Sequence, residues 1–247
     1  MIELRKFTAK GYEQARQHFA KAIEIDPNYA EPHHLTSFAH TNDVRFGYSS
    51  DPAKSFGLAG KFAAQALAIE PENAEALAMV AFLRFVQKKI PESLEIAYQA
   101  LEKAPNEPGV TFALAWILLY SGDPESAITY YTKIKRLAPV PSFAILNGDL
   151  LAHIYAGKYE EAKKLVPVYL ARTPEALRPA NLVFAAIPFF QTNQIDKANS
   201  MVEEALNLDP NLSISVFRPF DLPFVDKSIP ESFYVIYRKL GIPDLPE

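Results

Sequence analysis

The chain has 247 residues, of which 49% are hydrophobic, enough apolar side chains to bury a substantial core. Its 25 basic and 29 acidic residues give a net charge of −4 and form no basic stripe, which argues against nucleic acid as a partner. The absence of cysteine excludes disulfides, thiol catalysis and cysteine-ligated metals. By its length the chain could form one domain or two.

The chain shows no pattern that would direct it to a membrane. Residues 1–10 are charged and contain no apolar run of the signal-peptide type. The longest apolar stretches, at 110–120 and 182–190, are too short for a membrane span. We therefore expect a cytoplasmic protein.

Six prolines close amphipathic stretches at nearly regular positions, with successive intervals of 44, 34, 34, 35 and 36 residues. Proline ends a helix because it lacks a backbone donor and restricts the residue before it. A period of 34 resembles that of the tetratricopeptide repeat, a helix–turn–helix unit that ends in proline. The prolines are Pro27, Pro71, Pro105, Pro139, Pro174 and Pro210.

Small residues recur at fixed distances before these prolines, where the two helices of such a repeat cross. Ile134 and Tyr169 interrupt the pattern in adjacent repeats, so we expect looser or offset packing there. The positions twelve and five residues before the prolines are Ala15, Ala59, Ser93, Ala127, Ala162 and Ala198, and Ala22, Ala66, Ala100, Ile134, Tyr169 and Ala205.

The first predicted element is the second helix of a repeat, at residues 12–25, preceded by only a stub of a first helix. The stub is either a degenerate cap or the cut end of a longer protein. We favour a cut end, because an uncapped repeat exposes apolar surface. The longer first interval indicates an insertion at about residues 42–54, which should lengthen both helices of its repeat. Ser50 or Asp51 is expected to cap the second helix, with Pro52 in its first turn.

The composition changes after residue 212. Residues 216–224 hold three phenylalanines and two prolines, and residues 230–240 predict a final helix that Gly241 stops. The sequence thus predicts an all-α fold, in which about five and a half tetratricopeptide-like repeats form a right-handed superhelix of antiparallel helix pairs. This array should span residues 1–212, and residues 213–247 should form a C-terminal capping segment and helix.

Two segments carry a narrower resemblance. The insertion at residues 45–52 is similar to one in the repeat tails of bacterial class III adenylate/guanylate cyclase-like and winged-helix regulator proteins. The ending, with Pro223 to Asp226, Phe233 and Leu240 to Pro243, also resembles those tails. The resemblance implies a regulatory or scaffolding region, since neither cyclase motifs nor a winged-helix domain can be placed on this chain.

The resemblance to tetratricopeptide repeats also implies a binding face, because the first helix of each repeat lines the concave side in that family. Its middle would be apolar and aromatic here, centred on Phe82, Phe85, Phe112 and Trp116, and such a cluster marks a ligand site when it is exposed. The candidate partner-binding residues are His34, Phe38, Phe82, Phe85, Phe112, Trp116, Leu119, Asn147, Leu151 and Phe190.

Two other interpretations of these aromatic residues stay open. The rings could bury one another as core, or the segment with Phe217, Phe220 and Phe224 could cover them. Some family members hold a peptide carboxylate with lysine, arginine and asparagine. Only Asn147 and His34 are available here, so an apolar or amphipathic peptide fits better.

The sequence shows no constellation for chemistry. His33 and His34 point about 100° apart on a helix, and His40 lies two turns away, so we expect structural or surface histidines and no metal or other cofactor. Pairs such as Glu160–Glu161 are typical of solvated helix faces. We expect a non-enzymatic scaffold that binds a protein or peptide, as the accessory region of a bacterial signalling protein. The alternatives are a self-association module, for which a dimer is possible, and a sensor of a small hydrophobic ligand in the same groove.

Overall fold

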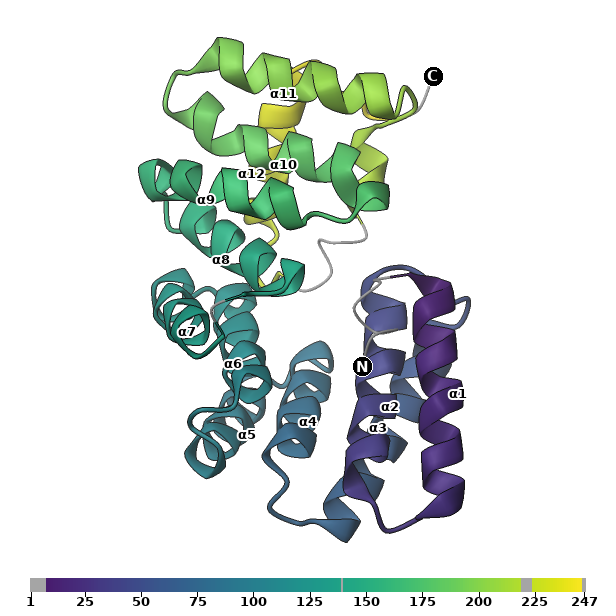
Figure 1. Cartoon of the computed structure of the whole chain (residues 1–247). Coiled ribbons are helices and arrows are strands. Elements are labelled where there is room, and N and C mark those ends of the chain that lie inside the picture. Colours follow the sequence, from purple (N-terminus) through teal and green to yellow (C-terminus); the bar gives the residue numbers. More distant parts are fainter. Residues whose placement is uncertain (1–7, 139, 219–223, 246–247) are drawn as a thin grey trace. The chain divides into compact units, whose positions relative to one another are not determined.

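The computed structural model describes residues 8–138, 140–218 and 224–245. Pro139, Phe220 and Pro223, which the sequence analysis singles out, lie outside these residues. Within them, regular structure consists of twelve α-helices and short 3-10 turns, without a strand (Figure 1). The helices are α1 (Ala9–Ile25), α2 (Ala30–Arg45), α3 (Pro52–Ile69), α4 (Ala74–Val86), α5 (Ile90–Lys103), α6 (Pro108–Ser121), α7 (Pro124–Leu137), α8 (Phe143–Tyr155), α9 (Tyr159–Arg172), α10 (Arg178–Gln191), α11 (Ile195–Leu208) and α12 (Ser228–Lys239).

Ten of these helices form five consecutive pairs, α2–α3 to α10–α11, while α1 is the second helix of an incomplete pair. The predicted all-α fold of stacked helix pairs is confirmed. The contacts divide the chain into two compact units, Met1–Ile117 and Leu118–Glu247, with the boundary inside α6. No helix among the described residues combines the length and the apolar character needed to cross a bilayer.

Alanines bring the helices together at the crossings, as the repeat pattern predicts. Ala59, Ala127, Ala162 and Ala198 are completely buried, and Ala15 is 2% exposed. Ser93 takes the equivalent place in α5, and its hydroxyl donates to the Ala81 carbonyl over 2.7 Å. A small side chain at each crossing lets the axes approach, so that larger neighbours fill the remaining volume.

At the two positions that interrupt the pattern, the large side chains of Ile134 and Tyr169 are both completely buried. The Tyr169 ring stacks on Phe143 with 5.7 Å between ring centroids, and its hydroxyl donates to Asn147 Oδ1 over 3.1 Å. The same hydroxyl oxygen also lies within hydrogen-bonding distance of the Asn181 side chain. Neighbouring α8 and α10 thus supply a ring and two amides that accommodate the large side chain.

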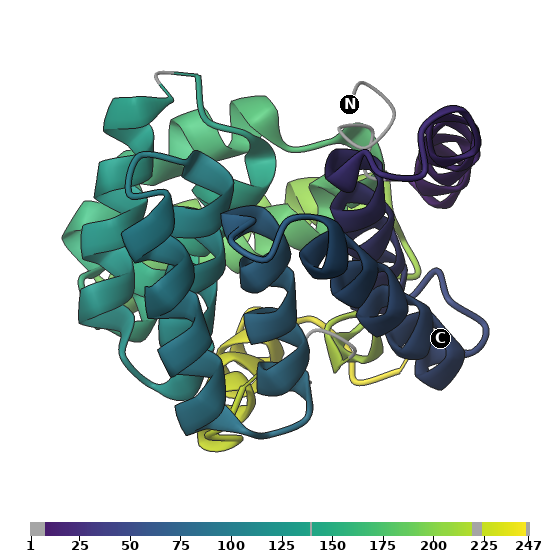
Figure 2. The same cartoon turned by 90° about the horizontal axis from the view of Figure 1, so that it is seen from below.

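The insertion lengthens its helix pair. Helix α2 has 16 residues and α3 has 18, whereas α4 to α11 have 13 or 14. Asp51 caps α3 as expected, accepting from the Lys54 backbone N–H over 3.0 Å, and Pro52 is the first helical residue. The connecting loop (Figure 2) places Phe46 and Tyr48 against Tyr12 of α1, at centroid distances of 6.2 and 6.3 Å.

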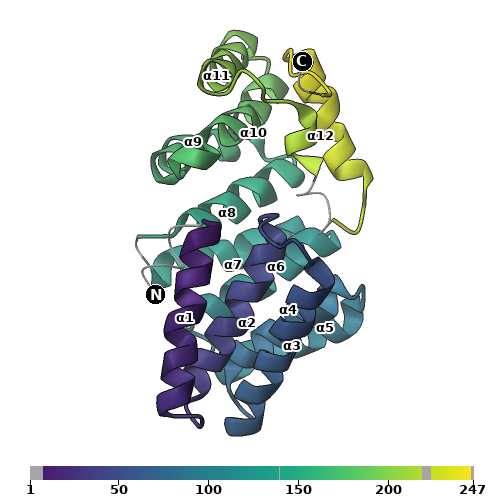
Figure 3. The same ribbon diagram turned by 90° about the vertical axis from the view of Figure 1, so that its right-hand side faces the viewer.

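The end of the chain packs against α10 (Figure 3). Helix α12 begins at Ser228, two residues before the predicted start, and its Phe233 ring meets Phe184 of α10 edge-on. Gly241 follows the helix with a φ of +89°, the left-handed conformation that glycine adopts without strain. The Ile214 N–H donates to the Pro243 carbonyl over 2.8 Å, which ties the segment before α12 to the segment after it.

Candidate functional site

The first-helix face of unit 1, formed by α2, α4 and the start of α6, contains six of the ten predicted binding residues. Trp116 of α6 is its centre. The Trp116 ring lies 4.6 Å from that of Phe82 and 5.2 Å from that of Phe85, measured between centroids. The Arg45 guanidinium carbon lies 5.6 Å from the centre of the Trp116 ring. The structure therefore brings Phe82, Phe85 and Trp116 of the predicted centre together, with a cation beside them.

The rings differ in exposure. Trp116 and Phe85 are 2% and 4% exposed, so they form the support of this face. Phe82 and Phe112 are half-buried and present part of each ring to solvent. Phe38 is also half-buried, but it packs toward α1 against a cluster of Tyr12, Ala15, Phe19 and Ala39. A partner on this face would meet Phe82 and Phe112 first.

Carboxylates border the same face near the start of each first helix. Burial raises the pKa of Glu75, and the charges of Glu107 and Glu31 raise it further. The Glu75 Oε2 atom lies 3.3 Å from Nε2 of His34. Burial lowers the pKa of His34 against the opposing effects of Glu31 and Glu70. The border is therefore acidic, and its central carboxylate contacts an imidazole whose neutral form is favoured.

Helix α2 contributes buried polar atoms that the sequence reasoning did not foresee. His34 Nδ1, Ser37 Oγ and Thr41 Oγ1 are buried and have no hydrogen-bond partner among the described residues. They lie three or four residues apart, so they occupy one side of the helix. The sequence does indicate these buried polar atoms, because residues 33–43 are unusually polar for a buried helix.

The other predicted residues lie in unit 2, where they are buried or contact other residues of the chain. Leu119 is completely buried and Leu151 is 6% exposed. Asn147 accepts from the Tyr169 hydroxyl, and the Lys239 ammonium lies 6.0 Å from the centre of the Phe190 ring.

The C-terminal segment covers part of the first helices in unit 2. The Phe224 ring meets Tyr120 and Tyr155 edge-on, with centroid distances of 4.7 and 6.2 Å. The Val225 N–H donates to the Tyr120 carbonyl over 3.0 Å. Phe217 instead packs on Tyr237 of α12. Unit 1 is therefore the better candidate for an external partner.

Two of the histidines that are not predicted to bind a partner contact backbone carbonyls of the chain. His33 Nε2 lies 3.2 Å from the Pro27 carbonyl, and His153 Nδ1 lies 2.8 Å from that of Asp149. No group of three or more histidine, aspartate and glutamate side chains converges as a metal site in the described part of the chain.

Comparisons with known proteins identify the fold. Residues 10–29 and 110–141 match the family model of the tetratricopeptide repeat. None of the curated protein sequences matches the chain.

Several solved structures resemble it. YrrB, described as a TPR protein with an unusual peptide-binding site, is 17% identical with a TM-score of 0.54, over 78% of this chain and 93% of YrrB. PilF of Pseudomonas aeruginosa is 19% identical with a TM-score of 0.59, over 89% of this chain and 93% of PilF. A chain of the APC/C hetero-tetramer Cut9–Hcn1 is 13% identical with a TM-score of 0.68, over 87% of this chain and 40% of that one. The repeat match and these structures show that the chain has the tetratricopeptide-repeat fold.

Proposed function

We propose that this chain is a non-catalytic scaffold that holds a protein segment on the first-helix face of unit 1. The observation that carries the proposal is the half-buried Phe82 ring packed against the buried Trp116 ring. A partly exposed ring on a rigid aromatic support is typical of binding hot spots, since the support keeps its position and water is easily displaced from it. Tetratricopeptide repeats generally bind proteins or peptides, in agreement with this assignment.

The charges beside the rings define the partner further. Glu31, Glu75 and Glu107 favour a partner that carries a basic group. We therefore propose an amphipathic peptide that places an apolar side chain on Phe82 and a lysine or arginine near Glu75.

The test is a peptide selection on the intact chain, followed by affinity measurements on two variants. Phe82→Gln removes the exposed ring, and Tyr98→Gln removes a 41% exposed ring from α5 as a matched control. We expect the selected peptides to lose at least about tenfold in affinity for Phe82→Gln, the loss of one hot-spot side chain. Affinity for Tyr98→Gln should stay unchanged. Equal binding to both variants, with thermal unfolding like that of the parent, would place the peptide elsewhere.

We further propose that the scaffold is the accessory region of a larger cytoplasmic signalling protein of bacterial type. The resemblance of the insertion and the C-terminal ending to regulator tails supports this context, and residues 213–247 would then be the cap of the array. The complete coding sequence provides the test. A catalytic or DNA-binding domain in the same reading frame is expected, and a reading frame without one contradicts the proposed context while leaving the binding proposal intact.

A further inference from the structure

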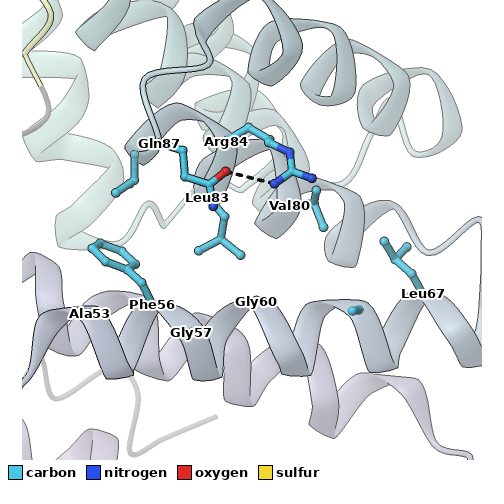
Figure 4. A pocket seen from close by; sticks show the side chains of 11 residues that line it. Ala53, Phe56, Gly57, Gly60, Leu67, Val80, Leu83, Arg84 and Gln87 are labelled. Carbon is cyan, nitrogen blue, oxygen red and sulfur yellow. Dashed lines mark hydrogen bonds between the residues drawn. The ribbon is translucent and has the colours of Figure 1, made fainter.

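A second apolar groove lies between α3 and α4, within unit 1 (Figure 4). Its volume is about 470 Å³. Phe56 and Leu67 of α3 point toward α4, while Leu83 of α4 points back toward Gly60 between them. Ala53 and Leu67 both line the groove, and helical geometry spaces them about 20 Å apart along α3. The groove is therefore elongated rather than a compact hole.

The groove lies where the lengthened α3 meets the end of the shorter α4. Its α3 wall starts at Ala53, in the first turn of α3, and its α4 wall ends at Val86 and Gln87. Gln87 accepts from the Arg84 guanidinium over 3.0 Å at the border. This groove does not include Phe82, Trp116 or any other residue of the first-helix face proposed above.

Two glycines of α3 form the floor of the groove, although packing within the chain would allow larger residues at both positions. Glycine inside a helix costs about 1 kcal/mol relative to alanine, and α3 contains both Gly57 and Gly60. A Cβ at Gly57 would have nothing within 4 Å, and one at Gly60 would meet only Leu83 Cδ1, at 3.9 Å. Neither glycine has a positive φ. Packing within the chain therefore does not require either glycine, whereas close approach of another molecule would.

The charged side chains on the helix segments that form the two walls of the groove are basic. Residues 52–69 and 80–89 include five basic side chains and no acidic one. Glu92 pairs with Arg84 and Lys89, at 2.6 and 3.6 Å. Lys54, Lys61 and Lys88 form no ion pair with the described residues. Lys54 and Lys61 are exposed and two turns apart, so they flank the same side of α3.

We propose that this groove binds an acidic amphipathic helix of a partner protein. Its apolar stripe would lie on the glycine floor between Phe56 and Leu67, because small residues let two helix axes approach closely. Its glutamates or aspartates would face Lys54, Lys61 and Lys88, whose charges are available for pairing. The elongated groove matches a helix in length, and its charge selects an acidic partner.

The test uses the full chain and a fluorescent designed helix of about 18 residues, five turns. The probe has leucine and alanine on one face and glutamate on both flanks, and a second probe carries lysine in place of every glutamate. We expect the acidic probe to bind, to weaken at least about tenfold between 50 and 500 mM salt, and to bind far better than the basic probe. Absence of binding by the acidic probe, or equal binding by both probes, would overturn the proposal.

Two variants place the probe in the groove. Gly57→Leu fills the open space above the floor with a strong helix former, so probe affinity should fall at least about tenfold while the melting temperature stays equal or rises. Lys54→Glu/Lys61→Glu should weaken binding by a similar factor. Lys10→Glu/Lys21→Glu reverses two exposed charges on α1 and should leave binding unchanged, as a matched control.

Other occupants give different results. If decanoate binds and the acidic helix does not, the groove takes a small amphiphile and the proposal is wrong. If the parent dimerises in sedimentation and Gly57→Leu abolishes the dimer, the occupant is a second copy of the chain, which also overturns the proposal. Neither outcome changes the expected effect of Phe82→Gln on peptides selected for the first-helix face, so the two proposals fail independently.

Discussion

His40 of α2 stacks on Phe62 of α3, with ring centroids 6.1 Å apart and planes inclined by 16°. Burial lowers the pKa of His40 to about 4, and the nearby Arg16 charge contributes. Because the unfolded chain binds a proton near pH 6.5 and the folded chain does not, the unfolded state gains protons as pH falls. Lowering the pH from about 6.5 to about 4 therefore destabilises the fold through His40.

We expect His40→Gln to remove that part of the pH dependence, since glutamine does not titrate. Melting temperatures of parent and variant, measured between pH 7.5 and pH 4.5, provide the test. The parent should lose more stability than the variant as pH falls. His18, which is exposed on α1, provides the control variant His18→Gln, whose pH profile should follow that of the parent. Parallel profiles for all three proteins would contradict the assignment.

A buried charge cluster in unit 2 shows what residue types alone cannot predict. Asp149 of α8 is completely buried and accepts from the Lys135 ammonium of α7. Its Oδ1 atom lies 3.3 Å from Nδ1 of His153, one turn along α8. Burial lowers the pKa of His153, but hydrogen bonds to Asp149 outweigh it and leave the pKa raised. The sequence predicts a structural role for His153, but its partner on another helix depends on how the two helices pack.

At the scale of elements, the contact between α7 and α8 depends on one glycine. A Cβ added to Gly148 would overlap the phenol ring of Tyr131. Both residues are buried, so the Tyr131 ring cannot turn away from Gly148 into solvent. The absence of a side chain at Gly148 is what lets the tyrosine of α7 lie against the backbone of α8.

We expect Gly148→Ala to destabilise the protein by roughly 1–3 kcal/mol, the usual cost of overpacking a core, although alanine favours the helix itself. Urea denaturation followed by circular dichroism measures the change. Gly60→Ala is the matched control, because the added methyl makes only an ordinary contact with Leu83 and should not destabilise α3. A Gly148→Ala variant as stable as the parent would show that Tyr131 can move aside.

The repeat pattern predicts most of the fold because it acts through local rules. Proline spacing and buried alanines set helix boundaries and crossings, and Asp51 with Pro52 predicts the start of α3. The α3–α4 groove is not predictable in that way, since Gly57 and Gly60 indicate only a weak helix in the sequence. Likewise, the spacing of Phe82 and Trp116 places them on first helices but does not determine which ring is exposed. Exposure depends on the distance between helices, which many side chains set together.

At the scale of the molecule, successive helices contact one another from α1 to α5 in unit 1 and from α7 to α11 in unit 2, as in other repeat arrays. Stability in such arrays is approximately a sum of the intrinsic stabilities of the repeats and the interfaces between neighbours. Local unfolding can therefore open part of an array while the rest stays folded. The structure places α2 and α3 in unit 1 and α7 to α9 in unit 2.

Hydrogen exchange of the Gly148→Ala variant tests this locality. The strain at Tyr131 belongs to the α7–α8 interface, so amide exchange should accelerate in α7, α8 and α9. Exchange in α2 and α3 should match that of the parent, because their most extensive helix contacts are with α1, α4 and each other, all in unit 1. The comparison is made without denaturant, where partial opening dominates exchange. Uniform acceleration across all helices would instead show that the chain opens as a single cooperative structure, and the nearest-neighbour description would then fail for this protein.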